Sequence, residues 1–281
     1  MTAVIKIKGL SYSYDNGLPA LKDIDFKINQ GEIVALVGQN GAGKTTLVKH
    51  FIGLLRPAVG QVTVCGKDVS GTRISDLSKE VGFVFQNPDH QIFNDTVEKE
   101  VAFGLLNRGL PDREIRDRVA EALQEVGLDH LAGAYPHSLS RGQRQRVALA
   151  SVLALQTGII VLDEPTTGQD YQERLQIMEL IRSLNKAGHT IIFITHDMSL
   201  VARYAKRVIV LCQGKIIMDG STREVLSQPD RLAQTLLEPP QIMLLANRLT
   251  TLENFQVTPS SEVILTVDEM YSYLMSVLEG N

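Results

Sequence analysis

The stretch from Gly38 to Thr45 constrains the fold of this chain more than any other feature. It reads Gly-Gln-Asn-Gly-Ala-Gly-Lys-Thr and directly follows an apolar run at 33–37. This spacing is typical of a loop that joins a buried strand to a helix and wraps around phosphate. Its backbone N–H groups turn toward an anion, and the following helix adds the positive end of its dipole. The competing interpretation, a glycine turn without a ligand, is disfavoured by the strand-loop-helix setting.

Two side chains of this loop have expected roles with the phosphates. Lys44 is predicted to reach the β- and γ-phosphates, and Thr45 to place its hydroxyl on Mg²⁺. Backbone groups of the loop and the first helical turn supply the other contacts. The predicted nucleotide-binding residues in this segment are Gly38, Gln39, Asn40, Gly41, Ala42, Gly43, Lys44, Thr45 and Thr46.

Short apolar runs recur along the chain and indicate its fold class. They lie at 33–37, 81–85, 159–162 and 190–195. Such runs are typical of parallel strands buried on both faces, whereas the alternation at 4–8 and 24–28 indicates antiparallel strands. Helical patterns lie between the runs. We therefore expect an α/β fold that contains a mixed sheet core, an antiparallel β subdomain, an inserted helical subdomain at about 87–156 and a small C-terminal extension.

Composition narrows the class of protein. The chain has 281 residues, 44% of them apolar, and a formal net charge of −4, which argues against a nucleic-acid footprint. No apolar run approaches the 18 or more residues that a membrane span needs, and the N-terminus lacks the core of a signal peptide, so we expect a cytoplasmic protein. Its two cysteines, Cys65 and Cys212, are expected to be small buried hydrophobes rather than a disulfide.

The run at 159–162 ends in two acids, Asp163 and Glu164. Asp163 is predicted to hold Mg²⁺, as the acidic partner strand does beside a phosphate-binding loop. Glu164 is predicted to polarise the attacking water, a role that requires a carboxylate within hydrogen-bond reach. Alternatively, Asp163-Glu164-Pro165 begins a turn or a helix, where acids favour the N-terminal dipole. The phosphate-binding loop favours the first interpretation.

The segment Leu139-Ser140-Arg141-Gly142-Gln143 lies between these motifs. It resembles the signature of the ATP-binding-cassette family. Ser140 and Gln143 also form the pattern of a capping box that opens a helix, and both interpretations can hold together because a capped helix N-terminus also binds phosphate.

With these motifs in this order, residues about 3–235 resemble the ATPase subunit of an ATP-binding-cassette transporter. The resemblance implies ATP and Mg²⁺ as ligands and extends the site. Gln86 matches the glutamine that touches Mg²⁺ and the water, His196 matches the switch histidine beside the γ-phosphate, and Tyr14 matches the aromatic that stacks on adenine, with Tyr12 as the alternative. The implied catalytic residues are Glu164, His196 and Gln86, and the implied metal ligands are Thr45, Gln86 and Asp163.

The resemblance also implies a partner. In this family two ATPases enclose each nucleotide between the loop of one subunit and the signature of the other. The residues expected to serve the partner's nucleotide are Ser140, Arg141, Gly142, Gln143 and Asp170. Two positions depart from the usual pattern, since Arg141 stands where glycine is usual and Gln169 where leucine commonly precedes the aspartate. Arg141 is either harmless, because backbone groups do most of the cradling, or the mark of an unequal site in a heterodimer.

A narrower resemblance rests on Phe85-Gln86-Asn87-Pro88-Asp89-His90-Gln91-Ile92-Phe93. This segment is similar to the ATPases of energy-coupling factor transporters, which import vitamins and transition-metal ions. The similarity implies a second ATPase subunit, identical or different, together with a transmembrane coupling protein and a substrate-binding membrane protein, and a location on the cytoplasmic face of the membrane. Ile92 and Phe93 either border the groove that receives the coupling protein or belong to the core.

The sequence suggests a division into an ATP-binding domain at 1–235 and an extension at 236–281. The extension follows Pro239-Pro240, and Thr266 is expected to cap a last helix that presents Met270, Tyr273, Leu274, Val277 and Leu278 on one face. This helix either joins two subunits or packs on its own domain. The alternative functions are a soluble cassette ATPase that acts on ribosomes or DNA, a regulatory ATPase, and the ATPase of another transporter class.

Overall fold

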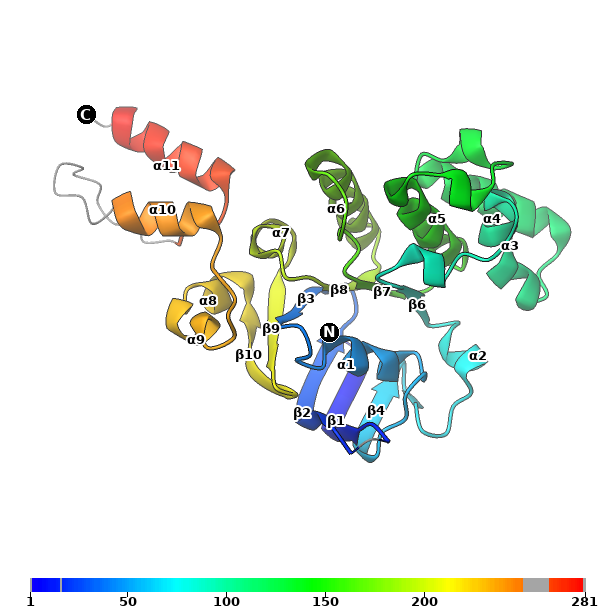
Figure 1. Cartoon of the computed structure of the whole chain (residues 1–281), viewed down its shortest axis with the longest axis horizontal. Coiled ribbons are helices and arrows are strands. Elements are labelled where there is room, and N and C mark those ends of the chain that lie inside the picture. The colour runs from blue at the N-terminus through cyan, green and yellow to red at the C-terminus, as the bar shows by residue number, and fades with distance from the viewer. Residues whose placement is uncertain (1, 16, 250–262, 280–281) are drawn as a thin grey trace.

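The computed structural model describes residues 2–15, 17–249 and 263–279, with the backbone alone for 277–279. A six-stranded sheet in the order β10-β9-β3-β8-β7-β6 forms its centre (Figure 1). Its strands are parallel, except that β10 runs antiparallel to β9. They comprise β3 (Ile33–Gly38), β6 (Val81–Val84), β7 (Ile159–Asp163), β8 (Thr190–Ile194), β9 (Arg207–Cys212) and β10 (Lys215–Ser221).

The central strands are buried on both faces, as their apolar runs predict. All residues of β3, β6, β7 and β8 are buried. On β3, Ile33, Ala35 and Val37 join one hydrophobic core, while Val34 and Leu36 join another. This division follows from the alternation of side chains along a strand. The parallel sheet expected from the sequence is therefore confirmed.

The second core lies between the central sheet and a four-stranded antiparallel sheet in the order β2-β1-β4-β5. Its strands are β1 (Ala3–Ser13), β2 (Pro19–Asn29), β4 (Val59–Val64) and β5 (Lys67–Asp68). Helix α1 (Lys44–Phe51) contributes Leu47, Val48 and Phe51 to this core. The antiparallel β region of the expected fold is thus confirmed, and α1 begins at the lysine of the phosphate-binding loop.

The first core lies on the opposite face of the sheet, under the helices. Helices α3 (Val97–Asn107), α4 (Asp112–Glu125) and α5 (Arg141–Ala154) pack on one another beyond β6 (Figure 1). Helices α6 (Tyr171–Lys186), α7 (Met198–Tyr204) and α8 (Thr222–Leu226) also contribute buried apolar side chains to this core. Three short 3-10 turns, Pro88–His90, Asp129–Leu131 and Pro136–Ser138, connect the helical group.

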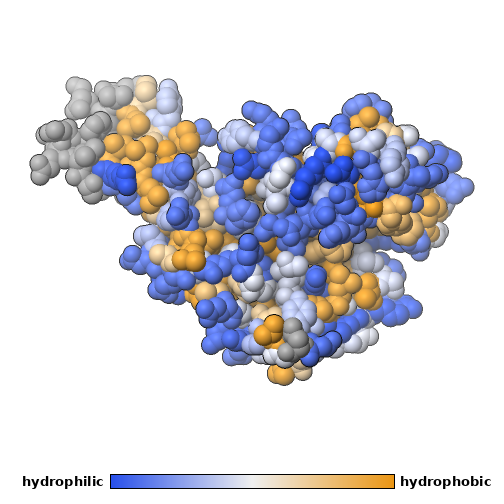
Figure 2. Space-filling model, viewed as in Figure 1, coloured by the Kyte–Doolittle hydropathy of each residue, from blue (hydrophilic) through white to orange (hydrophobic). Residues whose placement is uncertain are grey.

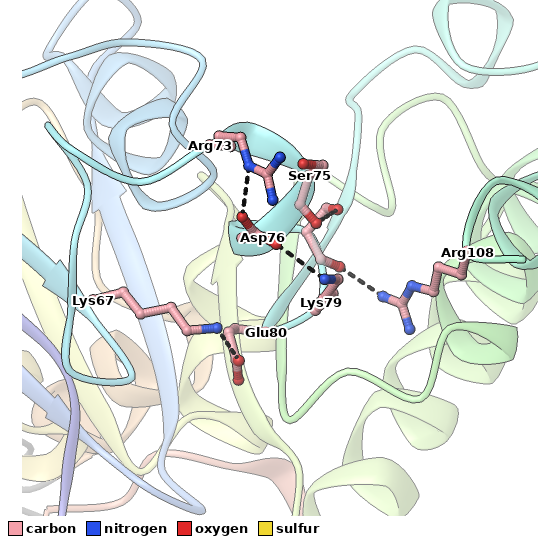
Figure 3. A network of polar contacts seen from close by, with 8 residues as sticks. Lys67, Arg73, Ser75, Asp76, Lys79, Glu80 and Arg108 are labelled. Carbon is pink, nitrogen blue, oxygen red and sulfur yellow. Dashed lines mark hydrogen bonds and ion pairs between the residues drawn. The ribbon is translucent and has the colours of Figure 1, made fainter.

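Arg108 ties the helical group to the segment that precedes β6. One of its terminal nitrogens donates to the backbone oxygen of Leu155 and the other to that of Ser78, each at 2.8 Å. Figure 3 shows Arg108 reaching toward helix α2 (Ile74–Leu77), where Arg73 and Lys79 flank Asp76. The exposed ion pairs contribute little. The two hydrogen bonds to carbonyl groups fix α3 relative to both α2 and the end of α5.

The C-terminal part consists of α9 (Pro229–Ala233), α10 (Gln241–Leu249) and α11 (Val267–Glu279). Thr266 accepts a hydrogen bond from the N–H of Glu269 at 3.2 Å, so the predicted cap of the last helix is confirmed. Met270, Tyr273 and Leu274 pack against α10, whereas the side chains of Val277 and Leu278 lie outside the described residues. Met243 and Leu265 join the main core, so part of this segment packs on its own chain.

Two further expectations have different outcomes. Cys65 is exposed and Cys212 is half-buried, so the prediction that both are buried is wrong. Cys65 lies in the left-handed turn (φ 47°) between β4 and β5. Both cysteines are free thiols, so the expectation of no disulfide between them is confirmed. Among the helices of the described ranges, none has the length and apolar content that a membrane span requires.

Candidate functional site

The loop between β3 and α1 has a backbone that requires glycine. Gly38, Gly41 and Gly43 have φ values of 148°, 79° and 103°. A Cβ on Gly38 would lie 2.2 Å from the carbonyl oxygen of Leu211, and one on Gly43 would lie 2.6 Å from that of Ala20. The loop is therefore pressed against β9 and β2, and its neighbours fix its shape.

Lys44 lies at the start of α1 and is 6% exposed. Its Nζ donates to the backbone oxygens of Gly38 and Gln39, each at 2.8 Å, so the side chain folds over its own loop. Burial lowers the pKa of Lys44, while the carboxylates of Glu164 and Asp163 oppose this shift. The structure therefore places a cation, held by two carbonyl groups, at the centre of the loop.

Thr45, in the first turn of α1, meets Asp163, the last residue of β7. The hydroxyl of Thr45 donates to Oδ2 of Asp163 at 2.8 Å. Burial raises the pKa of Asp163, while this hydrogen bond lowers it. Gln86 lines the same cavity as Thr45, so together these residues could offer one hydroxyl, one carboxylate and one carboxamide oxygen, a set of donors that suits Mg²⁺. Since Mg²⁺ usually takes only one or two carboxylates and completes its shell with phosphates and water, this set fits the predicted ion.

Glu164 is held by contacts from the ends of β6 and β8 and from its own turn. Its backbone is in the left-handed region (φ 48°), and its N–H donates to the oxygen of Ile194 at 3.1 Å. Oε2 accepts from Nε2 of Gln86 at 2.8 Å and from the hydroxyl of Thr167 at 2.9 Å. Nδ1 of His196 lies 3.6 Å from Oε1. The three predicted catalytic residues are thus brought together around one carboxylate.

A cavity of about 710 Å³ joins the loop to this cluster. Its lining contains most of the residues predicted in the nucleotide-binding and catalytic sets: Tyr14, Asn40, Gly41, Gly43, Lys44, Thr45, Thr46, Gln86, Glu164 and His196. Gly38, Gln39, Ala42 and Asp163 do not line it. Ala42 is buried in the second core, and Gly38 and Gln39 direct their carbonyl groups to Lys44.

The structure distinguishes the two candidate tyrosines. Tyr14 lines the cavity, and its hydroxyl is 2.9 Å from Oγ1 of Thr46. Tyr12 does not line it and instead meets Tyr14 edge to face at 5.3 Å between ring centroids. Tyr12 also meets His50 of α1 in the same way, at 5.0 Å. Tyr12 therefore packs between the rings of Tyr14 and His50 and supports Tyr14 without lining the cavity.

Leu18, Pro19 and Ala20 also line the cavity and were not predicted from the sequence. They precede and begin β2, and the N–H of Tyr14 donates to the oxygen of Leu18 at 3.1 Å. The sequence offers one indication that these residues belong to the site, which is that they follow Tyr14 closely in the chain. Apolar residues at the start of a strand carry no chemical motif.

The signature residues lie outside the cavity. Ser140 caps α5, accepting from the N–H of Gln143 at 3.2 Å, while Oε1 of Gln143 accepts from the N–H of Ser140 at 2.9 Å. The capping box is thus confirmed. Asp170 caps α6 through the N–H of Glu173 at 2.8 Å. The residues predicted to act on a partner's nucleotide therefore have no contact with the nucleotide cavity of their own chain.

The segment after Gln86 is bound to α5. Asp89 forms an ion pair with Arg144 at 2.8 Å, and Gln91 donates to the oxygen of Ala148 at 3.1 Å. Ile92 is buried, whereas Phe93 is 62% exposed and meets Phe103 edge to face at 4.6 Å. Of the two interpretations of this pair, the core applies to Ile92, whereas Phe93 lies on the surface, where a partner could contact it.

Comparison with known proteins identifies the family of the chain. The family model described as ABC transporter matches residues 21–167. The energy-coupling factor transporter ATP-binding protein EcfA of Methanothermobacter thermautotrophicus is 41% identical over 99% of this chain and 88% of its own length.

Two solved structures share the fold. CbiO1 of Clostridium perfringens, described as part of the ABC transporter complex CbiONQ, is 38% identical, with a TM-score of 0.76 over 88% of this chain and 100% of that one. The dimeric ATP-binding cassette MJ0796, in a post-hydrolysis state with ADP and phosphate, is 31% identical, with a TM-score of 0.71 over 78% of this chain and 99% of that one.

The chain spans about half the length of other curated relatives that it matches. It covers 45% of a putative ABC transporter ATP-binding protein of Caldanaerobacter subterraneus, to which it is 47% identical over 96% of its own residues. The extent of the family model and the match to nearly the full length of EcfA agree with the motifs and with the fold. The chain therefore belongs to the ABC transporter family of ATP-binding proteins, within which it resembles the energy-coupling factor members.

Proposed function

We propose that the chain hydrolyses ATP to ADP and phosphate, with Glu164 as the general base. The observation that carries this proposal is the convergence on one cavity of the Lys44 loop and the Glu164 carboxylate. Oε2 of Glu164 already accepts two hydrogen bonds, which leaves Oε1 as the acceptor for a proton from water. As the water oxygen bonds to the terminal phosphorus, the bond to the β-phosphate oxygen breaks and Glu164 takes the proton.

The other groups of the cavity have roles in the same step. Lys44 would exchange its two loop carbonyl partners for phosphate oxygens, and Gln86 and Thr167 would orient Glu164. His196 would donate to the terminal phosphate. Thr45 and Asp163 would hold Mg²⁺, which neutralises charge on the β- and γ-phosphates when bound. Tyr14 offers a ring on which a base can stack.

The test of this assignment is the Glu164→Gln variant. It removes the proton acceptor but keeps the size of the side chain, so turnover should fall by about 10²- to 10⁴-fold. ATP binding, measured by equilibrium dialysis, should persist. Glu238→Gln, at an exposed position remote from the cavity, is the control and should retain activity. Unchanged turnover in Glu164→Gln with ATP still bound would refute the role of Glu164.

We propose in addition that two ATPase subunits act together. The signature lies outside its own cavity, and a relative is dimeric with ADP and phosphate bound, so Ser140 and Gly142 are suited to a nucleotide on a partner. The extension at 236–281 offers a second contact. On α11, Val267, Tyr271 and Met275 follow one another at spacings of four and remain exposed. Figure 2 shows apolar side chains over this part of the surface.

The proposed work of the ATPase is import of a vitamin or a transition-metal ion at the cytoplasmic face of the membrane. Similarity to EcfA and to CbiO1 supports this role. The exposed Phe93 and Phe103, next to the segment that carries Gln86, suit an apolar helix of a membrane coupling protein. Recovery of the chain with a multi-span membrane protein would support transport, and recovery with ribosomes or DNA would refute it.

A further inference from the structure

The carboxylate of Glu173 lies directly on the signature glycine. A Cβ built on Gly142 would be 2.4 Å from Oε1 of Glu173, 2.6 Å from its Cδ and 2.8 Å from Oε2. Gly142 is accordingly buried, although it lies in the first turn of α5 at the surface between two helices. A negatively charged group of the same chain thus lies against the first turn of α5, the turn whose N–H groups are suited to a phosphate.

This placement of Glu173 is not imposed by its own helix. Glu173 is the third residue after the cap Asp170, the position from which an acid usually turns back to the cap N–H. Such reciprocal boxes are closed at α5, by Ser140 and Gln143, and at α8, by Ser221 and Glu224. At α6 the cap Asp170 accepts from the N–H of Glu173, but the reciprocal bond is not formed. The carboxylate points to α5 instead.

Arg141 completes the contact from the opposite side. Its guanidinium packs over Gly168, where a Cβ would lie 2.9 Å from Cζ of Arg141 and where φ is 76°. Within the described ranges, the guanidinium of Arg141 has no hydrogen bond or ion pair, whereas that of the nearby Arg144 is paired with Asp89. Two contacts therefore join the start of α5 to the segment 168–173. Arg141 of α5 packs on Gly168, and Glu173 of α6 packs on Gly142.

Electrostatics favours this arrangement in a free subunit. The first turn of α5 contains no acid, so the positive end of its dipole is not balanced within the helix. Glu173 supplies that negative charge from α6. A terminal phosphate of a nucleotide would supply it too, and more strongly, and the phosphate and the carboxylate would repel each other at the same helix end.

We propose that Glu173 is a gating residue, whose carboxylate lies against Gly142 and must move away before the terminal phosphate of the partner's nucleotide engages the signature. This inference rests on the proposed function of the signature. If Glu173 acts as a gate, moving its carboxylate makes the closure of two subunits around ATP less favourable. Binding of ADP is not affected in this way, because ADP lacks the terminal phosphate.

The experiment compares Glu173→Gln with the wild-type chain in two titrations. The ATP concentration for half-maximal hydrolysis should fall about two- to fivefold, the range expected for one charge at a helix N-terminus. The Kd for ADP should stay unchanged, because Glu173 does not line the cavity. Glu173→Asp keeps an acid in the first turn of α6 but shortens the side chain, and it should shift the ATP dependence in the same direction. Glu179→Gln, an exposed acid on the same helix, is the control and should match the wild type.

An unchanged or higher half-maximal ATP concentration in Glu173→Gln would overturn the proposal. Equal shifts for ATP and ADP would also overturn it, because they would indicate a general structural effect. If the wild-type chain hydrolysed no ATP, the proposed function itself would fail. A chain that hydrolyses ATP but does not respond to Glu173→Gln would refute the gate alone.

Discussion

The cavity around Lys44 and the start of α5 are built in opposite ways. Around Lys44, the chain satisfies its own polar groups, since Lys44 contacts its loop, Thr45 contacts Asp163, and Gln86 contacts Glu164. At α5, Arg141 is unpaired within the described ranges, and the carboxylate of Glu173 covers Gly142 instead of closing its own helix cap. The first region is preorganised, whereas the second is held by a contact between side chains of two helices. If the proposed gate is right, the cavity region is ready in one subunit, and the signature becomes available only when a second subunit displaces Glu173.

The largest expected effect comes from Lys44. Lys44→Met removes the cation that the loop holds, and hydrolysis should fall by about 10²- to 10³-fold, the usual loss when one electrostatic clamp on a developing charge is removed. Steady-state ATPase assays would measure it. Lys22→Met, at an exposed position on β2, should retain the wild-type rate. Activity in Lys44→Met within tenfold of the wild type would mean that the cavity is not the site of hydrolysis.

Substitution of a glycine by alanine should lower the free energy of unfolding more in the cavity region than at the start of α5. Gly43→Ala places a methyl group 2.6 Å from a backbone oxygen at φ 103°, and should lower the free energy of unfolding by roughly 2–4 kcal/mol. Gly142→Ala meets only the movable end of Glu173 in a helical backbone, so the change should stay within about 1 kcal/mol. Urea denaturation would compare the two variants. Equal losses in the free energy of unfolding would contradict the conclusion that the loop around Lys44 is more rigid than the contact at Gly142.

Tyr14 should show a smaller effect, on nucleotide affinity. Tyr14→Ala loses the ring on which a base stacks, which is worth roughly 1–3 kcal/mol, and should raise the KM for ATP accordingly. Tyr14→Phe keeps the ring and loses only the hydrogen bond to Thr46, worth about 1 kcal/mol. Tyr12→Ala should raise the KM less than Tyr14→Ala, because Tyr12 supports the ring without lining the cavity. A larger effect at Tyr12 would reverse the assignment of the two tyrosines.

The sequence predicted the cavity region well because its chemistry is local. Loop glycines, the following Lys44 and the acids at the end of β7 each carry a pattern, and parallel strands bring their carboxyl ends to the same edge of the sheet. Ala20 could not be found in this way, because it contributes an apolar surface with no motif.

The contact of Glu173 with Gly142 could not be predicted either. It joins residues 31 positions apart (173 − 142) through the relative placement of α5 and α6. The local pattern Asp170-x-x-Glu173 indicates a closed capping box instead. Sequence reasoning thus identified the two unusual residues, Arg141 and Gln169, but not that the guanidinium of Arg141 packs against the neighbouring Gly168. The roles of the predicted site residues remain predictions.

The smallest expected effect tests how completely the cavity region is preorganised. His50 is fully buried behind Tyr12, and its Nδ1 is 2.8 Å from the oxygen of Thr46. Burial lowers the pKa of His50, while the Thr46 carbonyl opposes the shift. Below the unfolded-state pKa of about 6.5, His50 binds a proton in the unfolded chain but not in the folded chain. The free energy of unfolding therefore falls as the pH decreases. The loss from His50 cannot exceed about 1.4 kcal/mol per pH unit.

A His50→Leu variant should therefore lose less stability than the wild type between pH 7 and pH 5, measured by urea denaturation at each pH. Its stability at pH 7 should be somewhat lower, because Leu cannot replace the hydrogen bond to Thr46. His130→Leu, which replaces an exposed histidine, serves as the control and should follow the wild-type pH dependence. Identical pH dependence in His50→Leu and the wild type would show that His50 binds its proton in the folded chain as readily as in the unfolded chain. The buried region behind Tyr12 and Tyr14 would then accommodate a charged imidazolium.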